Sequence, residues 1–91
     1  MNERNYNSIA EFLKAGREIE FSYNKKNYSI TTISGFWQVC CDTDNVVLEK
    51  VCRSEEFELL ESRIANVRID GVNMSTIFDN LLYDISSLCV F

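Results

Sequence analysis

Apolar and polar side chains alternate in the segment Glu18-Ile19-Glu20-Phe21-Ser22-Tyr23. This period of two is typical of a strand with one buried face and one solvent-facing face. Residues 28–33, 36–41 and 46–51 are also rich in β-branched, aromatic or small apolar side chains, and short polar turns separate the segments. Three or four sequential strands joined by short turns predict an antiparallel meander.

Helical spacing appears before and after these strands. Ser8 and Glu11 have the spacing of a capping box, so a short first helix is expected to begin at Ser8 and to end at Gly16. A second helix is expected from Ser54 as its N-cap, with Phe57, Leu60 and Ile64 on its buried side.

A third helix is expected from about Ser75. Its wide apolar face would hold Met74, Ile77, Phe78, Leu81, Leu82 and Ile85. The final apolar residues 88–91 are expected to add a short edge strand or to pack against the core. The predicted order is therefore α-β-β-β-β-α-α, an α+β fold whose helices cover one face of an antiparallel sheet.

Length and composition favour one globular domain spanning residues 1–91. The chain is 46% hydrophobic and 25% charged, which is ordinary for a folded domain. It contains no run of about 18 apolar residues, so no membrane span is expected. Residues 1–6 lack an apolar core of the kind that a secretory signal needs, and we expect a cytoplasmic protein.

The charge balance points to the kind of partner. Fourteen acidic residues against nine basic ones give a formal net charge of −5, and Lys25-Lys26 is the largest basic cluster. Phosphate backbones repel such a chain, so direct nucleic-acid binding is not expected. An acidic protein is better suited to meet a basic protein.

The residues that most enzymes use are scarce. The chain has no histidine, which removes the commonest general base and the commonest metal ligand. Its four cysteines are interpreted as thiols, mostly buried, because Cys40 and Cys41 are adjacent while Cys52 and Cys89 stand apart. That spacing does not match a zinc site. No catalytic residue, metal or cofactor is therefore assigned, and the chain is not expected to be an enzyme.

Two positions on the predicted helices suggest a protein-binding surface. On the second helix, Leu59 is expected to project away from the buried stripe, beside Glu55, Glu58 and Ser62. On the third helix, Tyr83 is expected to project from the polar side near Asp79. An apolar or aromatic anchor surrounded by acids suits a protein interface. Trp37 is a further candidate if its face of the sheet is open, although core packing is favoured for it.

Several segments give the chain its resemblance to known sequences. They are residues 16–24, Tyr28-Ser29-Ile30, Ile69-Asp70-Gly71 and Ile77-Phe78-Asp79-Asn80. With these segments the chain resembles a set of small bacterial proteins that look like immunity partners of polymorphic or contact-dependent growth-inhibition toxins. The resemblance implies a cytoplasmic protein that binds and neutralises a toxin, in many cases a basic nuclease, and it assigns no role to any residue.

Three other interpretations stay open at the level of sequence. One is an accessory protein of a phage or mobile element that blocks a host nucleic-acid enzyme by presenting negative charge. Another is a thiol enzyme or redox sensor built on Cys40-Cys41. The last is a small structural homodimer with no separate partner.

Overall fold

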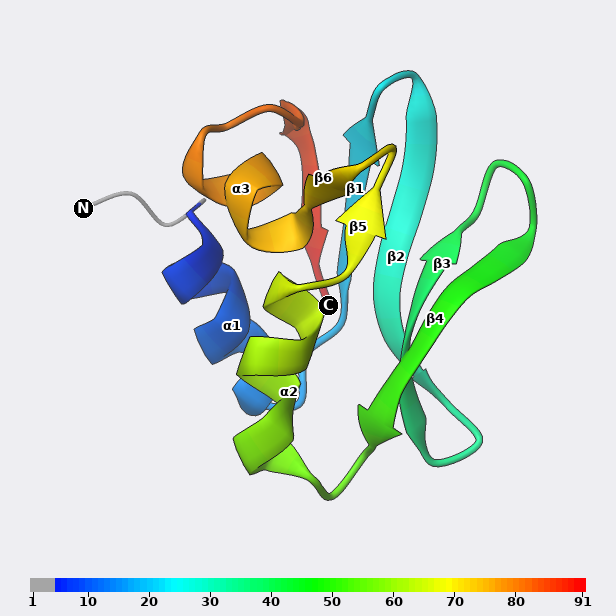
Figure 1. Cartoon of the computed structure of the whole chain (residues 1–91), viewed down its shortest axis with the longest axis vertical. Coiled ribbons are helices and arrows are strands. Elements are labelled where there is room, and N and C mark those ends of the chain that lie inside the picture. Colours follow the sequence, from blue (N-terminus) through cyan, green and yellow to red (C-terminus); the bar gives the residue numbers. More distant parts are fainter. Residues whose placement is uncertain (1–4) are drawn as a thin grey trace.

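The computed structural model describes residues 5–91, so the expectation about the first six residues lies mostly outside it. Within this range the chain forms three helices and seven strands (Figure 1). In chain order these are α1 Tyr6–Lys14, β1 Ile19–Tyr23, β2 Lys26–Ile33, β3 Phe36–Cys41, β4 Val46–Arg53, α2 Phe57–Ala65, β5 Arg68–Ile69, β6 Val72–Asn73, α3 Met74–Asp79 and β7 Asp84–Val90. None of the helices formed by residues 5–91 has the length and apolar character needed to cross a membrane.

Five of the strands form one antiparallel sheet in the order β4-β3-β2-β1-β7. The three helices lie together on one side of it, and β5 and β6 form a separate small hairpin between α3 and the sheet (Figure 1). The predicted α+β class, the meander of β1 to β4 and the short N-terminal helix are confirmed. The strands β5 and β6 separate the two expected C-terminal helices, and β7 follows the second of them.

Tight turns hold the meander in register. Asn24 and Lys25 connect β1 to β2 with φ values of 53° and 68°, and Ser34 and Gly35 connect β2 to β3 with φ values of 52° and 85°. Two central residues with positive φ are the mark of a two-residue hairpin whose twist matches that of the strands. The β1–β2 turn therefore needs no glycine, because an asparagine occupies its first left-handed position.

The first helix begins earlier than its capping-box pattern predicts. Asn5 is the N-cap, and its side-chain oxygen accepts a hydrogen bond from the Ser8 N–H at 3.0 Å. The expected role of Ser8 as N-cap is wrong, because the helix extends one turn toward the N-terminus. Gly16 ends the helix as predicted: its N–H donates to Leu13 O, and the Arg17 N–H donates to Phe12 O, which is the pattern of a left-handed glycine cap.

The second helix begins later than expected. Ser54 is not its N-cap, because the chain first makes a turn in which Glu56 accepts a hydrogen bond from the Arg53 N–H at 2.8 Å. Leu60 and Ile64 are fully buried as predicted. Phe57, the first residue of the helix, is 44% exposed and does not share their buried side.

The third helix is shorter than predicted. It ends at Asp79, and Leu81 adopts a left-handed conformation with a φ of 52°. Leu81 and Leu82 are exposed instead of lining a buried face. Residues 84–90 become β7, which pairs antiparallel with β1 so that Ile19 lies opposite Val90. The pairing of β7 with β1 outweighs the helical spacing of this segment, and the expected C-terminal edge strand is confirmed.

Aromatic rings at the centre of the core join the sheet to the C-terminal half. The Phe21 ring lies 5.7 Å from the Tyr28 ring, 5.0 Å from the Phe78 ring and 6.0 Å from the Tyr83 ring, measured between centroids. These four residues come from β1, β2, α3 and the segment before β7. Their burial therefore fixes where the last strand lies.

Replacing Phe21 with alanine should strongly destabilise the domain. Removing a fully buried phenylalanine ring costs about 3–5 kcal/mol, because apolar burial is lost and a cavity is left. Phe91 is 62% exposed, and Phe91→Ala should change stability by less than about 0.5 kcal/mol. Urea denaturation of both variants measures the difference. Similar free energies of unfolding for the two variants would contradict this account of the core.

Candidate functional site

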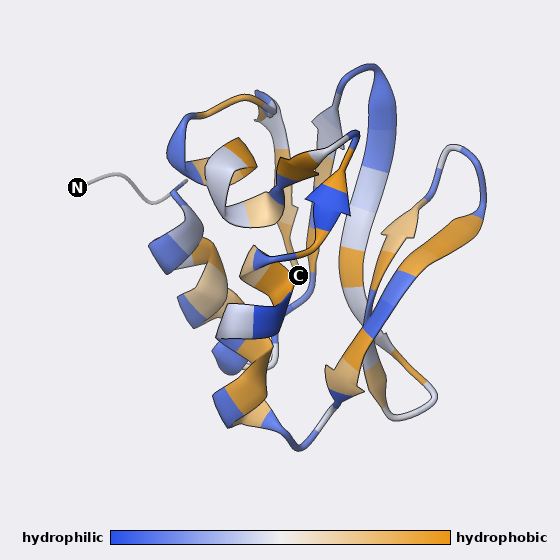
Figure 2. Ribbon diagram, in the orientation of Figure 1, coloured by the Kyte–Doolittle hydropathy of each residue, from blue (hydrophilic) through white to orange (hydrophobic). Residues whose placement is uncertain are grey.

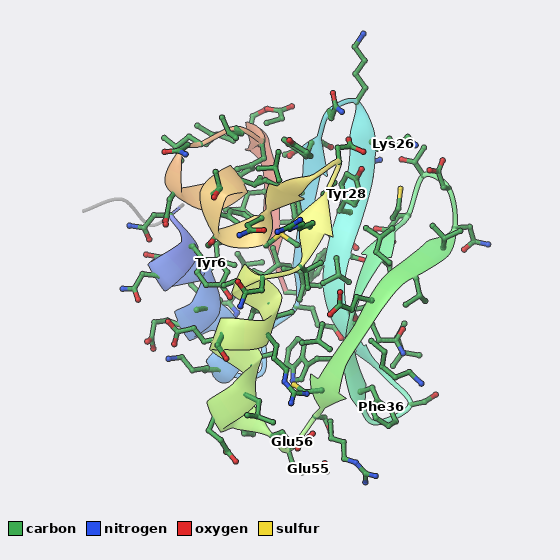
Figure 3. The ribbon with its side chains drawn as sticks, viewed as in Figure 1. Tyr6, Lys26, Tyr28, Phe36, Glu55 and Glu56 are labelled. Carbon is green, nitrogen blue, oxygen red and sulfur yellow. The ribbon has the colours of Figure 1, made fainter. Side chains whose placement is uncertain are left out.

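The predicted polar binding residues at the second helix lie on the surface. Glu55, Glu58 and Ser62 are all exposed. Glu55 and Glu56 lie at the junction between the end of β4 and the start of α2 (Figure 3). The exposed Phe57 follows them directly in the chain.

Leu59 does not project into solvent as predicted. It is half-buried and packs against the core. The reason is that α2 packs against β4 as well as against α1 and α3, which widens its buried arc. Phe57 replaces Leu59 as the exposed apolar residue of this helix.

Tyr83 and Asp79, which were expected to share the polar side of the third helix, differ in exposure. Tyr83 is only 4% exposed and its ring lies 4.7 Å from that of Phe78, so its expected exposure is wrong. The cause is the early end of α3, which turns Tyr83 into the core. Asp79 stays on the surface, but its carboxylate accepts a hydrogen bond from the Tyr6 N–H at 2.9 Å and so caps the first turn of α1. Trp37 is buried, as core packing requires.

The largest feature that the sequence reading missed is the outer edge of the sheet. Among residues 5–91, β4 pairs only with β3, and its first three residues are exposed: Val46 by 48%, Val47 by 54% and Leu48 by 42%. Figure 2 shows this hydrophobic part of β4 next to the β3–β4 turn. Three successive apolar residues cannot all face one side of a strand. The run Val46-Val47-Leu48 was therefore the feature of the sequence that could have indicated this exposed edge.

The backbone of β4 is open along part of this edge. The Asp42 N–H donates to Asn27 O, so alternate residues of β3, including Cys40, direct their backbone groups toward β2. Val47 lies opposite Cys40. In an antiparallel pair, opposite residues either bond to each other or both direct their backbone groups away. Because Cys40 directs its groups toward β2, the N–H and C=O of Val47 point away from β3 and into solvent. Further along, Arg63 Nη1 of α2 donates to Val51 O at 3.2 Å and covers the strand there. We call residues 46–50 the open β4 edge.

A hollow borders this edge on each face of the sheet. On the face opposite the helices, a hollow of about 240 Å³ is lined by Ile33, Cys40 and Val47, among others. On the helix side, another hollow of about 240 Å³ is lined by Tyr28, Leu48 and Ile69 together with charged residues of neighbouring turns. Exposed apolar side chains therefore border both faces.

Negative charge is concentrated in the chain segment that contains this strand and its junction with α2. Residues 42–58 hold six acidic side chains and two basic ones, a net of −4 in a chain whose net charge is −5. The acids are Asp42, Asp44, Glu49, Glu55, Glu56 and Glu58. Lys26 pairs with Asp44 at 2.7 Å, which lowers the pKa of Asp44 and raises that of Lys26. Within residues 5–91, Glu49, Glu55 and Glu58 form no ion pair.

The thiols are poorly placed for chemistry. Burial raises the pKa of Cys40, and the neighbouring Asp42 raises it further. Burial and Glu56 likewise raise the pKa of Cys52. Both side chains are therefore neutral thiols at physiological pH rather than nucleophilic thiolates. In the described part of the chain, no three acidic, cysteine or histidine side chains gather to hold a metal ion.

Comparisons with protein-family models, with curated proteins and with solved structures found no match to this chain. The candidate site is therefore defined by geometry and charge alone. It consists of the open β4 edge and the acidic junction with α2.

Alkylation of the native protein should distinguish Cys89 from the other thiols. Cys89 is exposed, whereas Cys40, Cys41 and Cys52 are buried. We expect one thiol to react quickly with iodoacetamide and three to react only on unfolding, because the reagent cannot reach a buried thiol. Mass spectrometry of the labelled peptides measures this, and Cys89→Ser should abolish the fast reaction. Fast labelling of Cys40 would instead revive a thiol-based function.

Proposed function

We propose that this domain acts in the cytosol by binding a basic protein, as the immunity partner of a toxin that it neutralises. The observation that carries the proposal is the concentration of negative charge beside exposed apolar surface. Residues 42–58 supply a net −4, and the same segment contains the open β4 edge and the exposed Phe57.

The two components of this surface serve different steps of binding. Acidic side chains without intramolecular ion pairs attract a basic partner and raise the rate of encounter. Apolar groups that leave water on contact then supply affinity, and aromatic residues are enriched among the side chains that contribute most. Phe57, placed between Glu55 and Glu58, combines both.

The composition supports binding over catalysis. The chain has no histidine, and two of its buried thiols have raised pKa values. A nuclease toxin is a suitable target, because a surface that binds nucleic acid is basic and an acidic protein can cover it. Neutralisation then needs only steric coverage of the toxin's active site.

Reversing the charge of Glu55 and Glu58 should weaken toxin binding. We expect the Glu55→Lys/Glu58→Lys variant to bind its cognate toxin domain at least about tenfold more weakly, with a slower association rate. Calorimetry and survival of cells that coexpress the toxin measure this.

A matched variant separates local from overall charge. Glu11→Lys/Glu20→Lys changes the net charge by the same amount at exposed positions of α1 and β1. It should retain binding and protection. Equal losses in both variants, or a toxin that is neither bound nor neutralised by the unchanged protein, would refute the proposal.

A further inference from the structure

We infer that the open β4 edge receives an extended, basic segment of the partner as a sixth strand of the sheet. This inference rests on the proposed function and specifies how the partner is held. An added strand gains affinity from main-chain hydrogen bonds and specificity from pockets that accept alternate side chains.

The backbone of β4 limits where such a strand can pair. The outward-facing groups of Val47 provide one donor and one acceptor to a neighbouring strand, as the register with Cys40 requires. Beyond residue 50, Arg63 already occupies Val51 O, and α2 packs alongside. The edge is therefore open over residues 46–50 and closed after them, which fixes one end of the added strand.

The side chains of β4 suit a strand that alternates. On one face the added residues would lie beside Val47, which borders the hollow that Ile33 and Cys40 also line. On the other face they would lie beside Leu48, which borders the hollow lined by Tyr28 and Ile69. Val47 and Leu48 thus offer an apolar contact to the incoming segment on each of its two faces.

Edge strands that are meant to stay alone are usually guarded by proline, by inward-pointing charge or by strong bulges. β4 has two irregularities in its pairing with β3. One lies between Val47 and Glu49, and the other between Lys50 and Cys52. It also carries the charged residues Glu49 and Lys50. However, the chain contains no proline, and the three apolar residues before Glu49 are exposed. Leu48 is the extra residue of one irregularity, but neither a proline nor a charged side chain interrupts residues 46–48.

Charge decides between a basic partner and a second copy of this chain. Pairing two copies through β4 would bring together two copies of residues 42–58, each with a net charge of −3 once Lys26, the ion-pair partner of Asp44, is counted, and these repel one another. A segment rich in lysine or arginine meets the same acids with attraction. The occupant is therefore a strand from a basic protein.

A pair of peptides tests backbone pairing on the unchanged protein. The probe is a nine-residue peptide of alternating lysine and valine, and the control is the same peptide with every second residue N-methylated. N-methylation removes hydrogen-bond donors along one edge and preserves charge and side chains. We expect the probe to bind with amide NMR shifts centred on residues 46–50. The methylated peptide should bind at least about tenfold more weakly.

Variants of Val47 provide an independent test of backbone pairing. Val47→Pro removes the outward N–H, which β3 does not use, and should weaken peptide binding about tenfold or more. Val47→Thr keeps the N–H and the β-branched shape, and should retain most of the affinity. If Val47→Pro does not fold, as circular dichroism would reveal, the two peptides alone decide the question.

Each contrary result has a distinct meaning. Equal binding of the two peptides, or no binding of either at millimolar concentration, overturns strand addition. It leaves the proposed function intact, because that function is tested by charge reversal at Glu55 and Glu58 with the toxin domain. Sedimentation that detects a dimer, disrupted by Val47→Pro, would show that a second copy occupies the edge, and this too overturns the inference.

Discussion

Burial of the Phe21 ring is the constraint from which the rest of the arrangement follows. This ring on β1 contacts Tyr28 of β2, Phe78 of α3 and Tyr83 just before β7. Since β1 must lie over the core, β2 and β7 pair on its two sides, and the helices stack over the same face. The meander can then extend only through β3 to β4. β4 becomes an outer edge because the core ends before it, and its first half remains exposed.

An exposed apolar edge is a liability for a small domain, since unpaired strand groups promote aggregation. Here the same segment carries most of the chain's net negative charge, which opposes association between copies. α2 covers the second half of the strand through Arg63, and leaves the first half open. The first half of β4 is thus exposed within a negatively charged segment. This arrangement suits a protein that must not associate with its own copies and must still bind a basic partner.

The local patterns predicted the meander well, because alternation in residues 18–23 and turns at residues 24–25 and 34–35 are short-range signals. The C-terminal segment could not be predicted in the same way. Residues 81–85 have helical spacing, yet pairing with β1, some 65 residues away in the chain, converts residues 84–90 into a strand. That change buries Tyr83 and removes it from the predicted surface. Glu58 and Ser62 are exposed as expected because they lie on the side of α2 away from Leu60 and Ile64, and Glu55 is exposed in the turn before the helix. The edge position of β4 is a property of the whole sheet, which no local pattern contains.

Hydrogen exchange of the Val47 amide tests the central claim most directly. In the free protein at low concentration this amide should exchange at the rate of an unprotected amide, whereas Ile30, in the middle of the sheet, should exchange slowly. Addition of the alternating lysine–valine peptide should slow Val47 at least about tenfold, the change expected from one new hydrogen bond. A Val47 amide as protected as that of Ile30 in the free protein, or one that the peptide leaves unchanged, would contradict an open strand edge that binds by pairing.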